Sequence, residues 1–164
     1  MLVFKKVETP EDIKVTAQMA VEVWNDSFVD MIGQAQVDYM LDLYQSEKAM
    51  TEQIASGYEY YHFTLGETVI GYFAIREEDD NTLFLSKLYL KNDYQGNGYA
   101  RQAFEYIKEI GKKNGNTLIW LTTNKRNFKA ITVYNKFGMR IIRSQETDIG
   151  NGFIMDDYVF GYAL

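Results

Sequence analysis

Between residues 83 and 123 the hydrophobic pattern changes from strand to helix and back to strand. An apolar run, TLFLSKLYL, is followed by a turn with two glycines, and apolar residues then recur at three- and four-residue spacing over 98–113. A short, nearly all-apolar run, TLIWLTT, comes next and predicts a strand buried on both faces. A strand, a helix and a strand in this succession predict a parallel pair of strands joined by a crossover.

The flanking segments add an antiparallel part to this sheet. Residues 58–90 alternate in the manner of three strands joined by turns, and two more strands are predicted at the C-terminus. One helix is predicted from Thr9 to about Asn25, a second over 34–57, and a last one from Asn127 to Gly138. These elements predict a single α/β domain over residues 1–164, with a mixed sheet of about six to seven strands and about four helices.

Composition excludes several classes of function. The chain has no cysteine and one histidine, His62, which we expect to be a packed strand residue, so we expect no disulfide and no metal site. No apolar run is long enough to span a membrane, and charges near the N-terminus argue against export, so we expect a cytoplasmic protein. The net charge of −6 argues against a nucleic-acid partner. It fits a small cationic partner, or simply solubility.

The glycine turn between Gln95 and Arg101 is a candidate anion site. Glycine lets backbone N–H groups face a ligand, and the first N–H groups of a helix have no partner within the helix. The alternative is a tight connector with glycines chosen for positive φ. Neither the P-loop pattern nor the dinucleotide-binding pattern fits, because both require glycine where Arg101 stands.

Two motifs together resemble those of the GNAT superfamily of N-acetyltransferases. The first is QGNGYA, from Gln95 to Ala100, and the second lies in NFKAITVYNKFGM, which begins at Asn127 and contains Tyr134. The resemblance implies the GNAT fold, whose parallel pair splays apart to admit acetyl-CoA as cosubstrate. It implies cofactor contacts at Leu88, Tyr89, Leu90, Gln95, Gly96, Asn97, Gly98, Tyr99, Ala100, Arg101 and Asn127. Lys125 and Arg126 are either near the ribose phosphate or solvated loop residues.

By the same resemblance, Tyr134 is the general acid that protonates the departing CoA thiolate. The alternative for Tyr134 is a core tyrosine on the inner face of its helix. Many relatives carry a glutamate base on the strand before the glycine turn, whereas this strand has no carboxylate. The general base is therefore not assigned, and the candidates are Asp26, Glu59, Asp156, Asp157, or a water chain. His62 is also possible, although a lone histidine on a strand is more often a packed residue.

The acceptor implied by the resemblance is a primary amine, with polyamines favoured over peptide N-termini or other small amines. Predicted acceptor contacts are Trp24, Asp26, Phe28 and Asp157, although the two aromatic residues fit a helix core equally well. A non-catalytic acyl-CoA-binding or sensor domain is the alternative function. A homodimer is an open alternative to a monomer.

Overall fold

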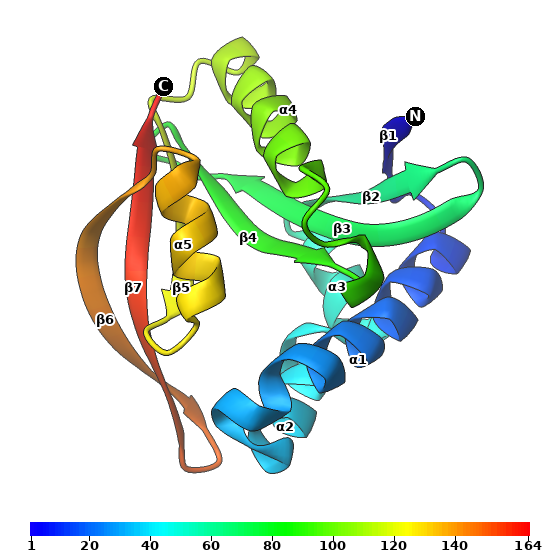
Figure 1. Cartoon of the computed structure of the whole chain (residues 1–164), viewed down its shortest axis with the longest axis vertical. Helices are drawn as coiled ribbons and strands as arrows, with labels where there is room; N and C mark the ends of the chain where they lie inside the picture. Colours follow the sequence, from blue (N-terminus) through cyan, green and yellow to red (C-terminus); the bar gives the residue numbers. More distant parts are fainter. The chain divides into compact units, whose positions relative to one another are not determined.

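The computed structural model describes the whole chain, residues 1–164. Seven strands are hydrogen-bonded in the order β1-β2-β3-β4-β5-β7-β6, and five α-helices accompany them (Figure 1). The strands are β1 (Leu2–Lys6), β2 (Glu59–Leu65), β3 (Thr68–Glu77), β4 (Thr82–Leu90), β5 (Leu118–Asn124), β6 (Arg140–Gly150) and β7 (Phe153–Ala163). The helices are α1 (Pro10–Ile32), α2 (Gln34–Tyr44), α3 (Glu47–Ala55), α4 (Tyr99–Lys113) and α5 (Phe128–Lys136), with a short 3-10 helix at Asn92–Tyr94. The predicted α/β class and mixed sheet are confirmed.

The chain forms two compact units. Unit 1 consists of Met1–Arg76 and Lys87–Ala103, and unit 2 of Glu77–Ser86 and Phe104–Leu164. Both β4 and α4 therefore contribute residues to each unit. In Figure 1, the blue and cyan helices α1, α2 and α3 belong to unit 1, and the yellow helix α5 belongs to unit 2.

In unit 1, helix α1 begins where the sequence predicts. Thr9 Oγ1 accepts from the backbone N–H of Asp12 at 3.1 Å, and the Asp12 carboxylate accepts from the backbone N–H of Thr9 at 3.2 Å. The helix continues past Asn25 to Ile32 and ends at Gly33, whose φ is 84°. His62 on β2 is buried, with its Nε2 atom 2.6 Å from Thr16 Oγ1 on α1, so it is packed as expected.

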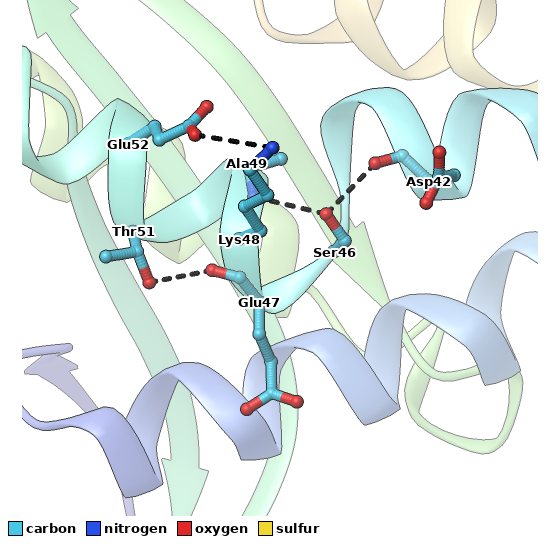
Figure 2. Close-up of polar contacts among 7 residues, drawn as sticks. All are labelled: Asp42, Ser46, Glu47, Lys48, Ala49, Thr51 and Glu52. Atoms are coloured by element: carbon cyan, nitrogen blue, oxygen red, sulfur yellow. Dashed lines mark hydrogen bonds and ion pairs between the residues drawn. The ribbon is translucent and has the colours of Figure 1, made fainter.

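The segment predicted as one helix over 34–57 is two helices, α2 and α3, separated at Ser46. The Ser46 hydroxyl donates to Asp42 O at 2.9 Å and accepts from the N–H of Ala49 at 3.1 Å, so it ends one helix and caps the next (Figure 2). Thr51 Oγ1 then donates to Glu47 O at 2.7 Å. Serine competes with the backbone for such hydrogen bonds, which explains the break that apolar spacing alone does not reveal.

In unit 2, β7 pairs antiparallel with both β5 and β6, and the start of β4 pairs parallel with β5. Phe104 on α4 stacks on Phe137 with ring centroids 4.9 Å apart and meets the edge of Tyr162 on β7 at 5.3 Å. The prediction that β5 is buried on both faces is wrong: fully buried residues alternate with partly exposed ones along the strand. None of the helices is long and apolar enough to cross a membrane.

Candidate active site

The glycine turn of unit 1 has the backbone that an anion site requires. Gly96 and Gly98 both have φ of 80°, a conformation that other residues rarely adopt, and no atom lies near the position of an added Cβ at either glycine. The Gln95 side chain holds the turn by donating to Leu90 O at 3.1 Å, and Asn97 Nδ2 donates to Tyr94 O at 3.2 Å. Residues Gln95–Ala100 are called the phosphate turn below.

The phosphate turn leads directly into α4, and the N–H of Gln95 at its start donates to Asn92 O at 3.2 Å, whereas the following N–H groups are unpaired. The first backbone bond of the helix runs from the N–H of Gln102 to Gly98 O at 3.1 Å. The N–H groups of residues 96–100 donate to no acceptor in the protein. Five donors beside a helix N-terminus form a local positive potential that suits phosphate oxygens. Arg101 is exposed in the first helical turn.

The end of β4 lies beside two of the predicted acceptor residues, also in unit 1. The Tyr89 ring centroid is 5.9 Å from that of Trp24 and 6.1 Å from that of Phe28, and these two rings are 4.8 Å apart. We call Trp24, Phe28 and Tyr89 the aromatic wall. In this wall Tyr89, a predicted cofactor contact, packs against Trp24 and Phe28, the predicted acceptor contacts from α1. Asp26 is exposed on the same helix.

Sequence reasoning missed Lys87, which precedes the predicted cofactor residues Leu88 to Leu90. Lys87 is only 6% exposed, and its Nζ atom donates to Gln53 Oε1 at 2.7 Å. Burial lowers the pKa of Lys87 to about 7. Lys87 follows Leu83 and Leu85 at a spacing of two, and both leucines are buried, so the strand pattern itself contained the signal.

In unit 2, the parallel pairing of β4 and β5 is short. Thr82, Leu83 and Phe84 pair with Leu118, Ile119 and Trp120, and no pair follows at Leu85 or Ser86. The Phe84 and Trp120 rings stack with centroids 4.1 Å apart at the last pair. Both strands continue beyond this point, but the parallel pairing within unit 2 ends at Phe84, before the segment where the resemblance implies a splayed pair.

Tyr134 lies on α5, whose start is fixed by Asn127. The Asn127 side chain accepts from the N–H of Ala130 at 3.1 Å and caps the helix as predicted. The Tyr134 ring packs 5.6 Å from Phe160 on β7, so the residue rests on the sheet. Burial raises the pKa of Tyr134 to about 12, which keeps the phenol protonated at neutral pH. Its hydroxyl makes no hydrogen bond within the protein.

Asp157 is a buried carboxylate on β7 in the same unit, 4% exposed. It pairs with Asn124 on β5 and Gln145 on β6, so three polar side chains share one face of the sheet. Since Tyr134 packs on Phe160, three residues further along β7, it lies against the opposite face. Burial, and then the neighbouring charge of Asp156, raise the pKa of Asp157 to about 6.

The other carboxylates considered as bases have different surroundings. Glu59 is paired with Lys6 at 2.8 Å. Asp156 is paired with Lys125 at 2.9 Å, so Lys125 has a partner in the protein, whereas Arg126 is exposed. Of the four candidates, Asp157 alone is buried.

Comparison with solved structures shows the fold. A PaiA N-acetyltransferase of Thermoplasma acidophilum, crystallised in complex with coenzyme A, is similar with a TM-score of 0.84 and 17% identity, covering 100% of this chain and 99% of that one. A GCN5-related N-acetyltransferase of Rhodopseudomonas palustris is similar with a TM-score of 0.82 and 17% identity, covering 99% and 95%. The predicted GNAT fold is thus confirmed.

Comparison of sequences gives the family. An uncharacterised N-acetyltransferase of Mycobacterium tuberculosis is 30% identical over 91 residues, which span 53% of this chain and 58% of the relative. The Acetyltransferase (GNAT) family matches residues 18–139, a span that contains both motifs up to Met139. The chain therefore belongs to the GNAT family of acetyltransferases.

Proposed function

We propose that the protein transfers the acetyl group of acetyl-CoA to a primary amine, by direct attack of the amine in a ternary complex. The observation that carries this proposal is the run of five unpaired N–H groups over residues 96–100, at the N-terminus of α4. Membership of an acetyltransferase family and the likeness to a coenzyme A complex support the choice of donor.

The donor-binding role rests on backbone groups of unit 1. The pyrophosphate of acetyl-CoA binds the N–H groups of the phosphate turn, with Arg101 as an additional positive charge. The pantetheine arm pairs with the backbone of Leu88, Tyr89 and Leu90 in the manner of an added strand. One N–H of this segment polarises the thioester carbonyl. Asn127 both caps α5 and contacts the cofactor.

The chemical roles fall on Tyr134 and Asp157. Tyr134 donates its phenolic proton to the CoA thiolate as the C–S bond breaks, which the unoccupied hydrogen-bonding capacity of its hydroxyl supports. Asp157 is ionised at neutral pH and attracts the ammonium group of the acceptor.

The acceptor we propose is a polyamine. Trp24 is the buried part of the aromatic wall, and the partly exposed rings of Phe28 and Tyr89 offer surface on which methylene and ammonium groups pack. Asp157 and Asp26 offer negative charge. The net charge of −6 favours approach of a cation.

Release of free CoA thiol in the presence of acetyl-CoA and an amine tests the function. We expect spermidine to give the fastest release, with amino acids and N-terminal peptides as comparison acceptors. Binding of acetyl-CoA is measured in parallel by calorimetry. Binding without release for any amine would favour a non-catalytic acyl-CoA-binding domain, and absence of binding would refute both functions.

A further inference from the structure

Lys87 is a buried amine held by neutral groups. Its Nζ atom donates to Gln53 Oε1 at 2.7 Å, and the Tyr60 hydroxyl donates to the same oxygen. The Nζ atom also lies 5.1 Å from the centroid of the Tyr60 ring and 5.9 Å from that of Tyr58. Gln53 is fixed in turn, because its Nε2 atom donates to Tyr44 O at 3.0 Å.

No carboxylate pairs with this amine. The groups that face it are the amide of Gln53 from α3, the ring of Tyr58 just before β2, and the ring of Tyr60 on β2. No ion pair includes it. The Tyr58 ring also contacts a charged group, the guanidinium of Arg76 on β3, at 4.5 Å from its centroid. Burial lowers the pKa of Lys87 to about 7 and raises that of Tyr60, so near pH 7 about half of the Lys87 side chains are the free amine, beside the protonated phenol of Tyr60.

The amine also shares a strand face with the aromatic wall. Lys87 and Tyr89 are two residues apart on β4, and side chains at that spacing project to the same face. The rings near Lys87 also pack in series with the aromatic wall: the ring centroid of Tyr60 is 6.3 Å from that of Tyr72, which is 5.4 Å from that of Tyr89. The lysine therefore lies on the side of β4 where the proposed function locates the acceptor.

We propose that Lys87, as the neutral amine, is the general base that deprotonates the acceptor. This inference rests on the proposed acetyl transfer. An N–H bond of the acceptor ammonium breaks, its proton moves to the lone pair of Lys87 Nζ, and the acceptor nitrogen keeps the electron pair. That nitrogen attacks the thioester carbonyl carbon, the C–S bond breaks, and the thiolate takes the Tyr134 proton. The Lys87 ammonium then releases its proton to solvent. The base thus comes from the strand on which the sequence shows no carboxylate.

The test compares an acceptor that needs a base with one that does not. Lys87→Met keeps a side chain of similar length without the amine, and Lys48→Met removes an exposed lysine as the matched control. The acceptors are spermidine, which is protonated at neutral pH, and trifluoroethylamine, whose fluorine atoms keep it largely neutral. We expect K87M to lower kcat/KM for spermidine by ~10²-fold, the usual contribution of a general base, and to leave trifluoroethylamine nearly unaffected. K48M should behave as wild type with both.

A loss of equal size for the two amines would overturn the proposal, because it would indicate a structural role. An unchanged rate of K87M with spermidine would also overturn it. If, in addition, only Asp157→Asn lost the acidic limb of the pH–rate profile, the base would be Asp157. Thermal unfolding of K87M verifies that the variant folds. NMR titration of the lysine ε-methylene groups in the wild-type protein needs no acceptor: one signal should titrate near pH 7, and its absence would also overturn the proposal. Wild-type protein that binds acetyl-CoA but acetylates neither amine would instead refute the transferase activity.

Discussion

Tyr134 and Asp157 each lie in surroundings that shift their pKa upward, and the consequences differ. For Tyr134, a pKa of about 12 means that the proton is present throughout the physiological range. We expect Tyr134→Phe to reduce kcat by ~10²-fold or more, because only the proton donor is lost. The dissociation constant for acetyl-CoA, measured by calorimetry, should stay within about twofold, since the ring that packs on Phe160 is kept. Comparable losses in kcat and in affinity would mean that Tyr134 acts in binding or structure.

Asp157 should destabilise the folded protein at neutral pH. Its pKa rises from 3.8 to about 6 on folding, so the folded state binds the extra proton between these values, and stability falls as the pH rises through this range. Above pH 6, the rise in the pKa of Asp157 lowers the free energy of unfolding by about 3 kcal/mol, at 1.36 kcal/mol for each pKa unit.

Asp157→Asn removes this charge and keeps the shape of the side chain. We expect the variant to unfold in urea with a free energy higher by ~2–3 kcal/mol at pH 7.5 and nearly unchanged at pH 4. If the variant is no more stable than the wild-type protein at either pH value, other groups in the folded protein stabilise the negative charge of Asp157. Lower activity together with higher stability is the trade-off expected of a functional carboxylate.

At the scale of elements, the phosphate turn depends on two glycines with positive φ. A side chain at Gly98 strains the turn and moves the N–H groups that face the ligand. We expect Gly98→Val to weaken acetyl-CoA binding by ~10-fold or more in calorimetry, the equivalent of about 1.4 kcal/mol.

Gly66 in the turn between β2 and β3 is the matched control for this substitution. It has φ of 60° and open space around it, as Gly98 has, but no assigned ligand. Gly66→Val should lower stability without changing the dissociation constant. If the two variants bind acetyl-CoA equally well, the phosphate role of the turn is wrong.

Local patterns predicted some elements well and others poorly. The caps at Thr9 and Asn127 were predictable because side chain and backbone lie within three residues of each other. The break at Ser46 was not, since a serine hydroxyl also donates to the carbonyl four residues earlier within a continuous helix. The base was sought among carboxylates and a water chain, and Lys87 was missed although its spacing from Leu83 and Leu85 on β4 predicts burial. That its buried amine meets the neutral amide of Gln53 depends on a tertiary contact, which no local pattern contains.

At the scale of the whole molecule, acetyl-CoA should stabilise the fold through mass action. A ligand that binds only the native state adds RT ln(1 + [L]/Kd), or about 2.7 kcal/mol at 100 times Kd. We expect the midpoint of thermal unfolding to rise by several degrees at that concentration, and to rise less in Gly98→Val at the same concentration. An unchanged midpoint would contradict binding to the native protein.

The two units are not successive lengths of chain, and this has a consequence for dissection of the protein. The chain passes between them three times, at the end of β3, within β4 and within α4. Each passage lies inside regular secondary structure, so no cut in an exposed linker isolates either unit, and each comprises two separate lengths of polypeptide. A cut at any of these three passages should therefore leave fragments that each lack part of a unit.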